Sequence, residues 1–230
     1  MWHRTFAKSF KRYNFTGQIM HFFPEALERY AEAHTKPEHD VLQQLNRETH
    51  ARVLMPQMLS GQLQGQFIRM ISLLVQPRYI LEIGTFTGYS AICLSEGLQE
   101  GGRLITIDVN EELKEMTERY FTLAGIMEKV DFRNGNAVNI IPTLDVTFDL
   151  VFIDADKMNY SLYYDLVIDK VRSGGIILAD NVLWSGKVVE DFQDGETQAL
   201  KDFNQKVQND ERVDNVLVTM RDGLMLIRKK

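Results

Sequence analysis

Oxygen-bearing side chains follow two short apolar runs of this sequence. Asp154 comes directly after residues 150–153, and Asp180 and Asn181 follow the run at 176–178 and Ala179. Such runs are typical of buried parallel strands whose carboxyl ends open onto a site. Two carboxylates and one amide oxygen are hard donors, which suit Mg²⁺ or Ca²⁺ better than Zn²⁺. Each residue alone could simply cap a loop or helix, but the two strand ends together favour a metal site.

A glycine-containing turn is the second chemical feature. Residues 81–90 read Leu-Glu-Ile-Gly-Thr-Phe-Thr-Gly-Tyr-Ser. Gly84 lets the chain turn sharply and approach a ligand, and the helix that follows offers unpaired N–H groups. Asp108, at the end of the next apolar run, is placed to accept hydrogen bonds from the two hydroxyls of a ribose. The pattern predicts an adenosine cofactor.

The glycine spacing and a neighbouring acid favour one class of adenosine cofactor. A dinucleotide-binding turn needs a middle glycine for close approach to the pyrophosphate, and the spacing Gly84-x-x-x-Gly88 lacks it. Glu82 would place negative charge near a pyrophosphate, whereas it suits a cofactor with an amino group or a cationic centre. S-adenosylmethionine has both, so it is the expected cofactor, and a nicotinamide-dependent dehydrogenase is the more distant alternative.

Alternating strand and helix patterns must position these groups. Strands are predicted at 79–83, 103–109, 129–133, 148–154 and 175–179, with helices at 89–97, 111–124, 137–144 and 160–171. This alternation predicts a mostly parallel sheet with helices on both faces. The tail differs, because residues 213–220 and 224–228 flank a turn at Arg221-Asp222-Gly223 and predict a hairpin with an antiparallel edge.

Three helical patterns precede this core. One begins at Pro24, one covers residues 38–53, and one covers residues 61–75 with apolar residues at three- and four-residue spacings. Residues 1–19 carry four basic side chains and no acid, and they are interpreted as an extension that serves as an arm or a lid. We therefore predict a single domain at 20–230, made of helices at 20–75 and an α/β core at 79–230.

Composition narrows the classes of partner. The formal charge of -6 argues against a surface for nucleic-acid phosphates or anionic lipid. No apolar run approaches the ~20 residues of a membrane span, and the single cysteine, Cys93, cannot form an intrachain disulfide. We expect a cytoplasmic protein without a nucleic-acid or membrane partner. An RNA methyltransferase or a non-catalytic binding module is the remaining alternative class, and the chain lacks an Asn-Pro-Pro-Tyr-type motif.

Three segments in the same order carry a family resemblance. Residues 81–90, 152–160 and 178–186 resemble the metal-dependent class I O-methyltransferases of the caffeoyl-CoA and catechol type, and the likeness runs from about Phe22 to the C-terminus. The resemblance implies a Rossmann-like α/β fold with a seven-stranded sheet whose last strand is antiparallel. It also implies a homodimer, whose interface we expect on the helices before residue 75.

The same resemblance implies roles for individual residues. The metal would be held by Asp154, Asp180 and Asn181, with Mg²⁺ as the default and Mn²⁺ or Ca²⁺ open. The methyl donor would be held by Met58, Ser60, Glu82, Gly84, Thr85, Ser90, Asp108, Ala137 and Asp154.

Catalysis would need an ionised acceptor hydroxyl. Chelating two adjacent hydroxyls to a divalent cation stabilises the phenolate and directs its attack on the methyl group. Lys157 is the predicted general base, because a nearby cation and partial burial favour the neutral amine; the simpler role is a surface lysine closing a loop. Asn181 would also touch the substrate, and Trp184 would wall the acceptor pocket, although simple packing is its alternative role.

The acceptor class follows from charge. Between Trp184 and Glu196 the only basic residue is Lys187, and it is followed by the acids Glu190, Asp191, Asp194 and Glu196. A CoA thioester brings several phosphate charges and calls for basic residues at the pocket mouth. We therefore expect a small free catechol such as a dihydroxybenzoate, caffeate or a flavonoid. A caffeoyl-CoA-type thioester is the alternative, for which the basic residues between 4 and 12 would supply the missing charge.

Overall fold

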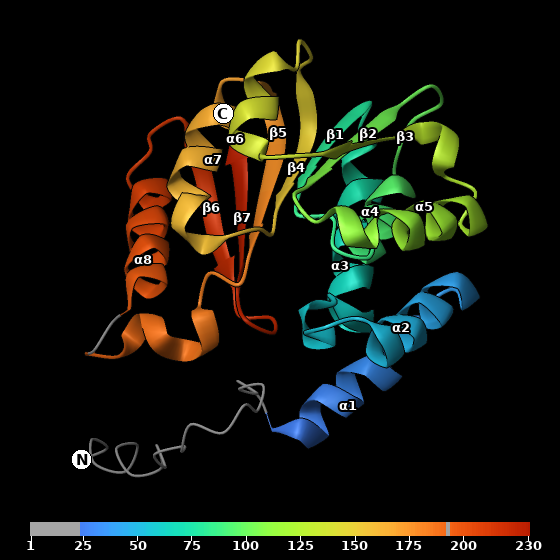
Figure 1. The fold of residues 1–230 in the computed structure, drawn as a ribbon. Coiled ribbons are helices and arrows are strands. Elements are labelled where there is room, and N and C mark those ends of the chain that lie inside the picture. Colours follow the sequence, from blue (N-terminus) through green and yellow to red (C-terminus); the bar gives the residue numbers. More distant parts are fainter. Residues whose placement is uncertain (1–23, 192–193) are drawn as a thin grey trace.

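One seven-stranded sheet organises the part of the chain that the computed structural model describes, residues 24–191 and 194–230 (Figure 1). The predicted arm at 1–19 lies outside the described residues. The strand order is β3-β2-β1-β4-β5-β7-β6. The strands are β1 (Tyr79–Ile83), β2 (Arg103–Asp108), β3 (Val130–Asn134), β4 (Phe148–Ile153), β5 (Val171–Asp180), β6 (Val213–Val218) and β7 (Leu224–Lys229).

The pairing matches the predicted topology. β1 to β5 pair in parallel, while β7 pairs antiparallel with both β5 and β6. The β6–β7 hairpin turns at Arg221-Asp222-Gly223, as its sequence predicts. The predicted sheet with an antiparallel last strand is therefore confirmed.

Helices cover both faces of the sheet. The α-helices are α1 (Glu25–Ala33), α2 (Asp40–Arg52), α3 (Gly61–Val75), α4 (Tyr89–Ser95), α5 (Lys114–Leu123), α6 (Ala137–Ile140), α7 (Tyr160–Ile168) and α8 (Gly195–Gln208). Short 3₁₀ turns are η1 (Pro56–Met58), η2 (Glu111–Leu113), η3 (Met127–Lys129), η4 (Ile141–Thr143), η5 (Lys157–Asn159) and η6 (Trp184–Val189). None of the helices in the described residues is long and apolar enough to cross a membrane.

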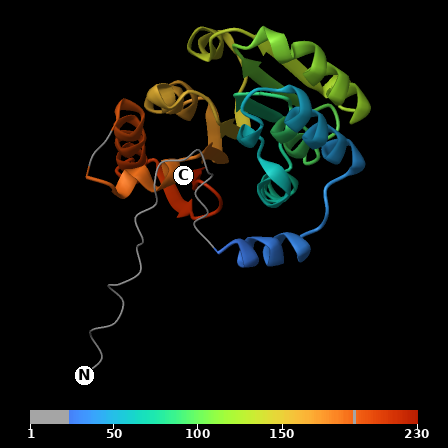
Figure 2. The same ribbon diagram turned by 60° about the horizontal axis from the view of Figure 1, so that its bottom comes forward.

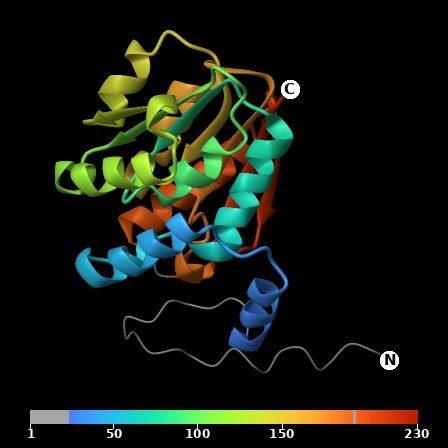
Figure 3. The ribbon, with the colours of Figure 1, turned by 90° about the vertical axis from the view of Figure 1, so that its right-hand side faces the viewer.

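Two hydrophobic clusters attach these helices to the sheet. Alternate residues along each strand point to opposite faces, so Ile153 joins the cluster under α6, α7 and α8, while Phe152 joins the cluster under α2 to α5. Figure 1 shows α6 to α8 on one side of the strands and α3 to α5 on the other. α1 has no buried residue and lies with α2 beyond one end of the sheet (Figures 2 and 3).

The boundary between α7 and β5 differs from the sequence prediction. The helix was expected to continue to residue 171 and the strand to begin at residue 175, whereas α7 ends at Ile168 and β5 begins at Val171. The β4–β5 register shifts between Phe148 and Leu150, opposite this first part of β5. Gly174 and Gly175 lie inside the strand at this irregularity, between Val171, which pairs with Phe148, and Ile176, which pairs with Leu150, so they resemble a loop in sequence.

α8 was missed in the sequence, where its region was read only as an acidic segment. Its N-terminus is capped by Asp194, whose side chain accepts a hydrogen bond from the backbone N–H of Thr197 at 2.8 Å. Leu200, Phe203 and Val207 are buried at three- and four-residue spacings. Phe203 meets Tyr160 and Tyr164 of α7 edge to face, with ring centroids 5.5 and 6.2 Å apart. The cap and the apolar spacing were the local signals that could have identified this helix.

Candidate active site

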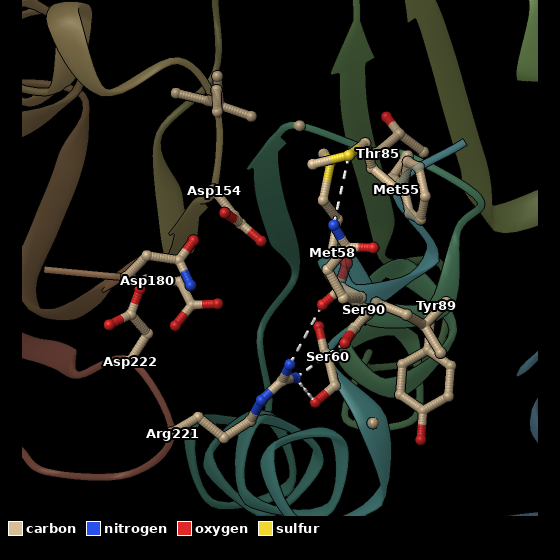
Figure 4. A pocket seen from close by; sticks show the side chains of 18 of the residues that line it. Met55, Met58, Ser60, Thr85, Tyr89, Ser90, Asp154, Asp180, Arg221 and Asp222 are labelled. Atoms are coloured by element: carbon tan, nitrogen blue, oxygen red, sulfur yellow. Dashed lines mark hydrogen bonds between the residues drawn. The ribbon is translucent and has the colours of Figure 1, made fainter. Parts of the chain in front are cut away.

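A cavity of about 1680 Å³ opens at the carboxyl ends of β1, β4 and β5. Figure 4 shows Asp154, Asp180 and Asp222 on one side of it, and Met58, Ser60, Thr85 and Ser90 on the other. The structure brings most of the predicted site together here. The predicted residues that line the cavity are Met58, Ser60, Gly84, Thr85, Ser90, Asp108, Ala137, Asp154, Lys157, Asp180, Asn181 and Trp184.

The predicted metal ligands meet because β4 and β5 are parallel neighbours. Ile153 pairs with Ala179, so Asp154 and Asp180 follow at adjacent positions. The ammonium of Lys157 donates to Asp154 Oδ1 at 3.2 Å and to Asn181 Oδ1 at 2.9 Å. One positive group therefore already links two of the three predicted ligand oxygens.

The surroundings of the Asp180 carboxyl group show whether these oxygens suit a cation. Its side chain is 3% exposed, and Oδ2 accepts a hydrogen bond from Gln64 Nε2 at 2.6 Å. Its Oδ1 is buried and has no hydrogen-bond partner among the described residues. Burial, followed by the charge of Asp154, raises the pKa of Asp180 to about 6. A buried carboxylate oxygen without a donor is unfavourable unless a cation compensates it, so the donor set fits Mg²⁺ or Ca²⁺.

The third predicted ligand distinguishes this set from an all-carboxylate site. No group of three or more His, Cys, Asp or Glu side chains in the described part of the chain is arranged to hold a metal ion. The predicted set has two acids, and its third oxygen comes from the amide of Asn181. The backbone of Asn181 is left-handed, with φ of 60°, a conformation that Asn tolerates better than most residues.

Lys157 is buried, so it is not the surface lysine that the simpler role required. The residue is 6% exposed, and its ammonium contacts the Tyr160 hydroxyl at 2.5 Å. The same hydroxyl donates to the backbone carbonyl of Asp180 at 2.8 Å. The ammonium also lies 4.6 Å from the Tyr160 ring centroid and 5.7 Å from that of Trp184. Tyr160, which the sequence analysis did not single out, thus connects the lysine to the end of β5.

Glu82, which was also predicted to hold the methyl donor, lies behind the residues that line the cavity. It is 0% exposed and is absent from the cavity lining. Ser90 Oγ donates to one of its carboxyl oxygens at 2.6 Å, and Thr106 Oγ1 donates to the other at 2.5 Å. Burial is the largest influence on this carboxyl and raises its pKa to about 8. Glu82 thus reaches the cavity lining through Ser90, and its assignment to the methyl donor stays a prediction.

Asp108 has a second role that its strand-end position did not reveal. Its Oδ2 accepts hydrogen bonds from the backbone N–H groups of Thr85 and Phe86, at 2.9 and 2.7 Å. Its Oδ1 accepts from the N–H of Asn110 at 2.8 Å. The carboxylate therefore holds the turn after β1 against the end of β2, and it lines the cavity at the same time.

Gly84 occupies a position where no side chain fits. Its φ is 97°, and a Cβ atom there would collide with the backbone carbonyl of Asp154. Two backbone hydrogen bonds enclose this point, from Gly84 N to Ile107 O and from Asp154 N to Ile83 O. The missing side chain lets the turn after β1 and the end of β4 approach each other.

The comparisons with known proteins identify the family. Residues 31–230 match the profile of a family described as O-methyltransferase. The chain belongs to this O-methyltransferase family. It is 34% identical over 179 residues to caffeoyl-CoA O-methyltransferase 1 of Arabidopsis thaliana, a match that covers 72% of this chain and 69% of that one. It is 32% identical over 179 residues to tricin synthase 2 of Oryza sativa subsp. japonica, covering 72% of this chain but only 61% of that longer protein.

Solved O-methyltransferase structures agree with this assignment. A methyltransferase from Podospora anserina in its SAH-bound form has a TM-score of 0.82 and 30% identity, covering 94% of this chain and all of that one (100%). An O-methyltransferase from Bacillus cereus in complex with SAH has a TM-score of 0.83 and 28% identity, covering 89% of this chain and 97% of that one. The O-methyltransferase identity expected from the sequence is therefore confirmed.

Proposed function

We propose that this O-methyltransferase transfers the methyl group of S-adenosylmethionine to one hydroxyl of a small catechol, with a divalent cation at Asp154, Asp180 and Asn181. The observation that carries this proposal is that all three side chains line one cavity, where the buried nitrogen of Lys157 donates to Asp154 and Asn181. The SAH-bound Podospora and Bacillus neighbours support the choice of donor, since SAH is the demethylated form of S-adenosylmethionine.

Different residues of the chain would deprotonate the acceptor, hold the base in place and exclude water. A bound divalent cation would supply the positive charge that favours ionisation of the acceptor hydroxyl. Lys157, as the neutral amine, takes the proton of that hydroxyl, and the oxygen forms a bond to the methyl carbon as the carbon–sulfur bond of the donor breaks. Tyr160 keeps the lysine nitrogen beside Asp154 and Asn181. Trp184 lines the cavity next to them and helps to exclude water.

The charge of the cavity supports a free catechol over a CoA thioester. The described lining residues include nine acids and three bases, Arg52, Lys157 and Arg221. Lys157 and Arg221 are committed to hydrogen bonds within the protein. Arg52 lies 3.2 Å from the carboxylate of Glu48. Several phosphate charges would find little compensation in such a lining.

The direct test is methyl transfer from S-adenosylmethionine to caffeic acid. Product should form with Mg²⁺, disappear with excess EDTA, and disappear in an Asp180→Ala variant that still binds SAH. Methylation that survives both EDTA and the substitution would overturn the cation-dependent mechanism. If caffeoyl-CoA were methylated much more efficiently than every free catechol tested, the acceptor proposal would be wrong while the reaction class stood.

A further inference from the structure

Gln64 joins Asp180 to a distant part of the chain. It lies on α3, is 1% exposed, and donates from Nε2 to Asp180 Oδ2 at 2.6 Å. Its Oε1 accepts a hydrogen bond from Arg221 Nη1 at 3.2 Å. The two contacts span 116 and 157 residues of sequence, so only the folded chain brings these three side chains together.

Arg221 is itself held firmly at the turn between β6 and β7. Its guanidinium donates to the backbone carbonyl of Leu59 at 2.8 Å and makes a close contact with that of Ser60 (Figure 4). Its backbone is left-handed, with φ of 48°. The guanidinium is therefore fixed at the start of α3, one helical turn from Gln64.

The charges of the two partners determine which way the Gln64 amide points. A guanidinium has only donors, so it must face the amide oxygen. A carboxylate oxygen of Asp180 accepts, so it must face the amide nitrogen. Both contacts are satisfied by a single orientation, and the reversed amide would lose both. Arg221 thereby selects the orientation in which Gln64 donates to Asp180.

We propose that Gln64 is a positioning residue for the cation-binding carboxylate of Asp180, and that Arg221 orients its amide. The inference rests on the proposed cation site. Gln64 occupies Asp180 Oδ2 and leaves Oδ1, which is buried and without a hydrogen-bond partner among the described residues, as the oxygen available to a cation. A neutral amide does this without adding charge, so it neither competes for the cation nor neutralises the carboxylate. Partners that orient a metal ligand in this way commonly change metal affinity by roughly 10- to 100-fold.

Gln64→Met tests this role, because methionine keeps the length of the side chain and removes both hydrogen bonds. Mn²⁺ binding to the full-length protein is measured by titration calorimetry, and SAH binding is measured on the same preparations. The dissociation constant for Mn²⁺ should rise about 10- to 100-fold, while that for SAH stays within about twofold of the parent. Arg221→Met should weaken Mn²⁺ binding less, because the Gln64 amide is still present but is free to reverse.

Gln66→Met is the matched control on the same helix. Its amide makes only a 3.5 Å contact with the backbone carbonyl of Pro37, so both affinities should be those of the parent. Parental Mn²⁺ affinity in Gln64→Met would overturn the positioning role. Loss of SAH binding together with Mn²⁺ binding would also overturn it, because the glutamine would then be a general support of the fold. A parent that binds SAH but not Mn²⁺ would instead refute the proposed cation site, and the inference with it.

Discussion

At the scale of single residues, the hydroxyl of Tyr160 holds the nitrogen of Lys157, the proposed general base, in place. Its hydroxyl lies 2.5 Å from Lys157 Nζ and donates to the carbonyl of Asp180 at 2.8 Å. The pKa of this buried phenol is raised well above its ordinary value, chiefly by burial and then by Asp154. The hydroxyl therefore stays protonated and can donate to the carbonyl while it accepts from the lysine.

Tyr160→Phe should slow methyl transfer without unfolding the protein. Removing the hydroxyl frees the lysine nitrogen to leave its place, so kcat should fall about tenfold or more. The hydrogen bonds of the hydroxyl with Lys157 and with the Asp180 carbonyl are both lost, which should lower the free energy of unfolding by about 1–3 kcal/mol. Tyr164→Phe is the control on the same helix, because its hydroxyl donates to Asp210 at 2.8 Å and lies away from the cavity. Urea unfolding should show similar losses in both variants, but only Tyr160→Phe should lose activity; equal kcat values in the two would contradict the role.

Glu82 should make stability depend on pH. Its pKa is about 8 in the folded protein and 4.5 as the reference for the unfolded chain. Between these values the folded state binds the extra proton, so the free energy of unfolding should fall as pH rises from about 4.5 to about 8 and level off above. The change should be on the order of a few kcal/mol. In Glu82→Gln, denaturation at pH 5.5 and pH 8 should give a smaller difference than in the parent; an unchanged difference would show that Glu82 is already ionised at the lower pH.

At the scale of elements, strand ends and short turns place the site, and most of them were predictable. α3 and β1 have the predicted bounds, because their apolar patterns are local and Pro77 separates them. α8 was missed although its Asp194 cap and its buried residues also follow a local pattern. The start of β5 was placed too late, because the glycines beside its irregular pairing with β4 look like a loop.

The turn after β1 gives a prediction for the junction between elements. Gly84→Ala should lower the free energy of unfolding by more than about 2 kcal/mol and abolish SAH binding, because the new methyl meets the Asp154 carbonyl as well as an unfavourable φ. Gly125→Ala is the control, since φ there is 68° but nothing lies within 4 Å of the added Cβ. That variant should lose only about 1–2 kcal/mol and keep SAH binding. Equal losses in the two would mean that backbone strain alone, and not the close approach of β1 and β4, requires Gly84.

At the scale of the whole molecule, the balance of charge around the cavity should select the acceptor. With nine acids and three bases among the described lining residues, the cavity should disfavour acceptors that carry several negative charges. The ratio of kcat/KM for caffeate to that for caffeoyl-CoA should therefore exceed one at low salt. It should decrease as ionic strength rises, because salt screens the repulsion of the thioester phosphates more than that of the single caffeate charge. A ratio below one at every salt concentration would contradict this selection.

The sequence by itself determined which residues stand at strand ends. Carboxyl ends of neighbouring parallel strands meet, so the approach of Asp154, Asp180 and Asn181 followed from local patterns together with the sheet topology that alternation implies. Only the tertiary structure decided how these groups are supported. Gln64 and Tyr160 contact Asp180, and Arg221 contacts Gln64 from a turn 157 residues further along the chain. These contacts depend on how the helices and the turn pack together, which local periodicity does not encode. The same reason applies to Glu82, since its strand position fixes its face of the sheet but not the Ser90 and Thr106 hydroxyls that cover it.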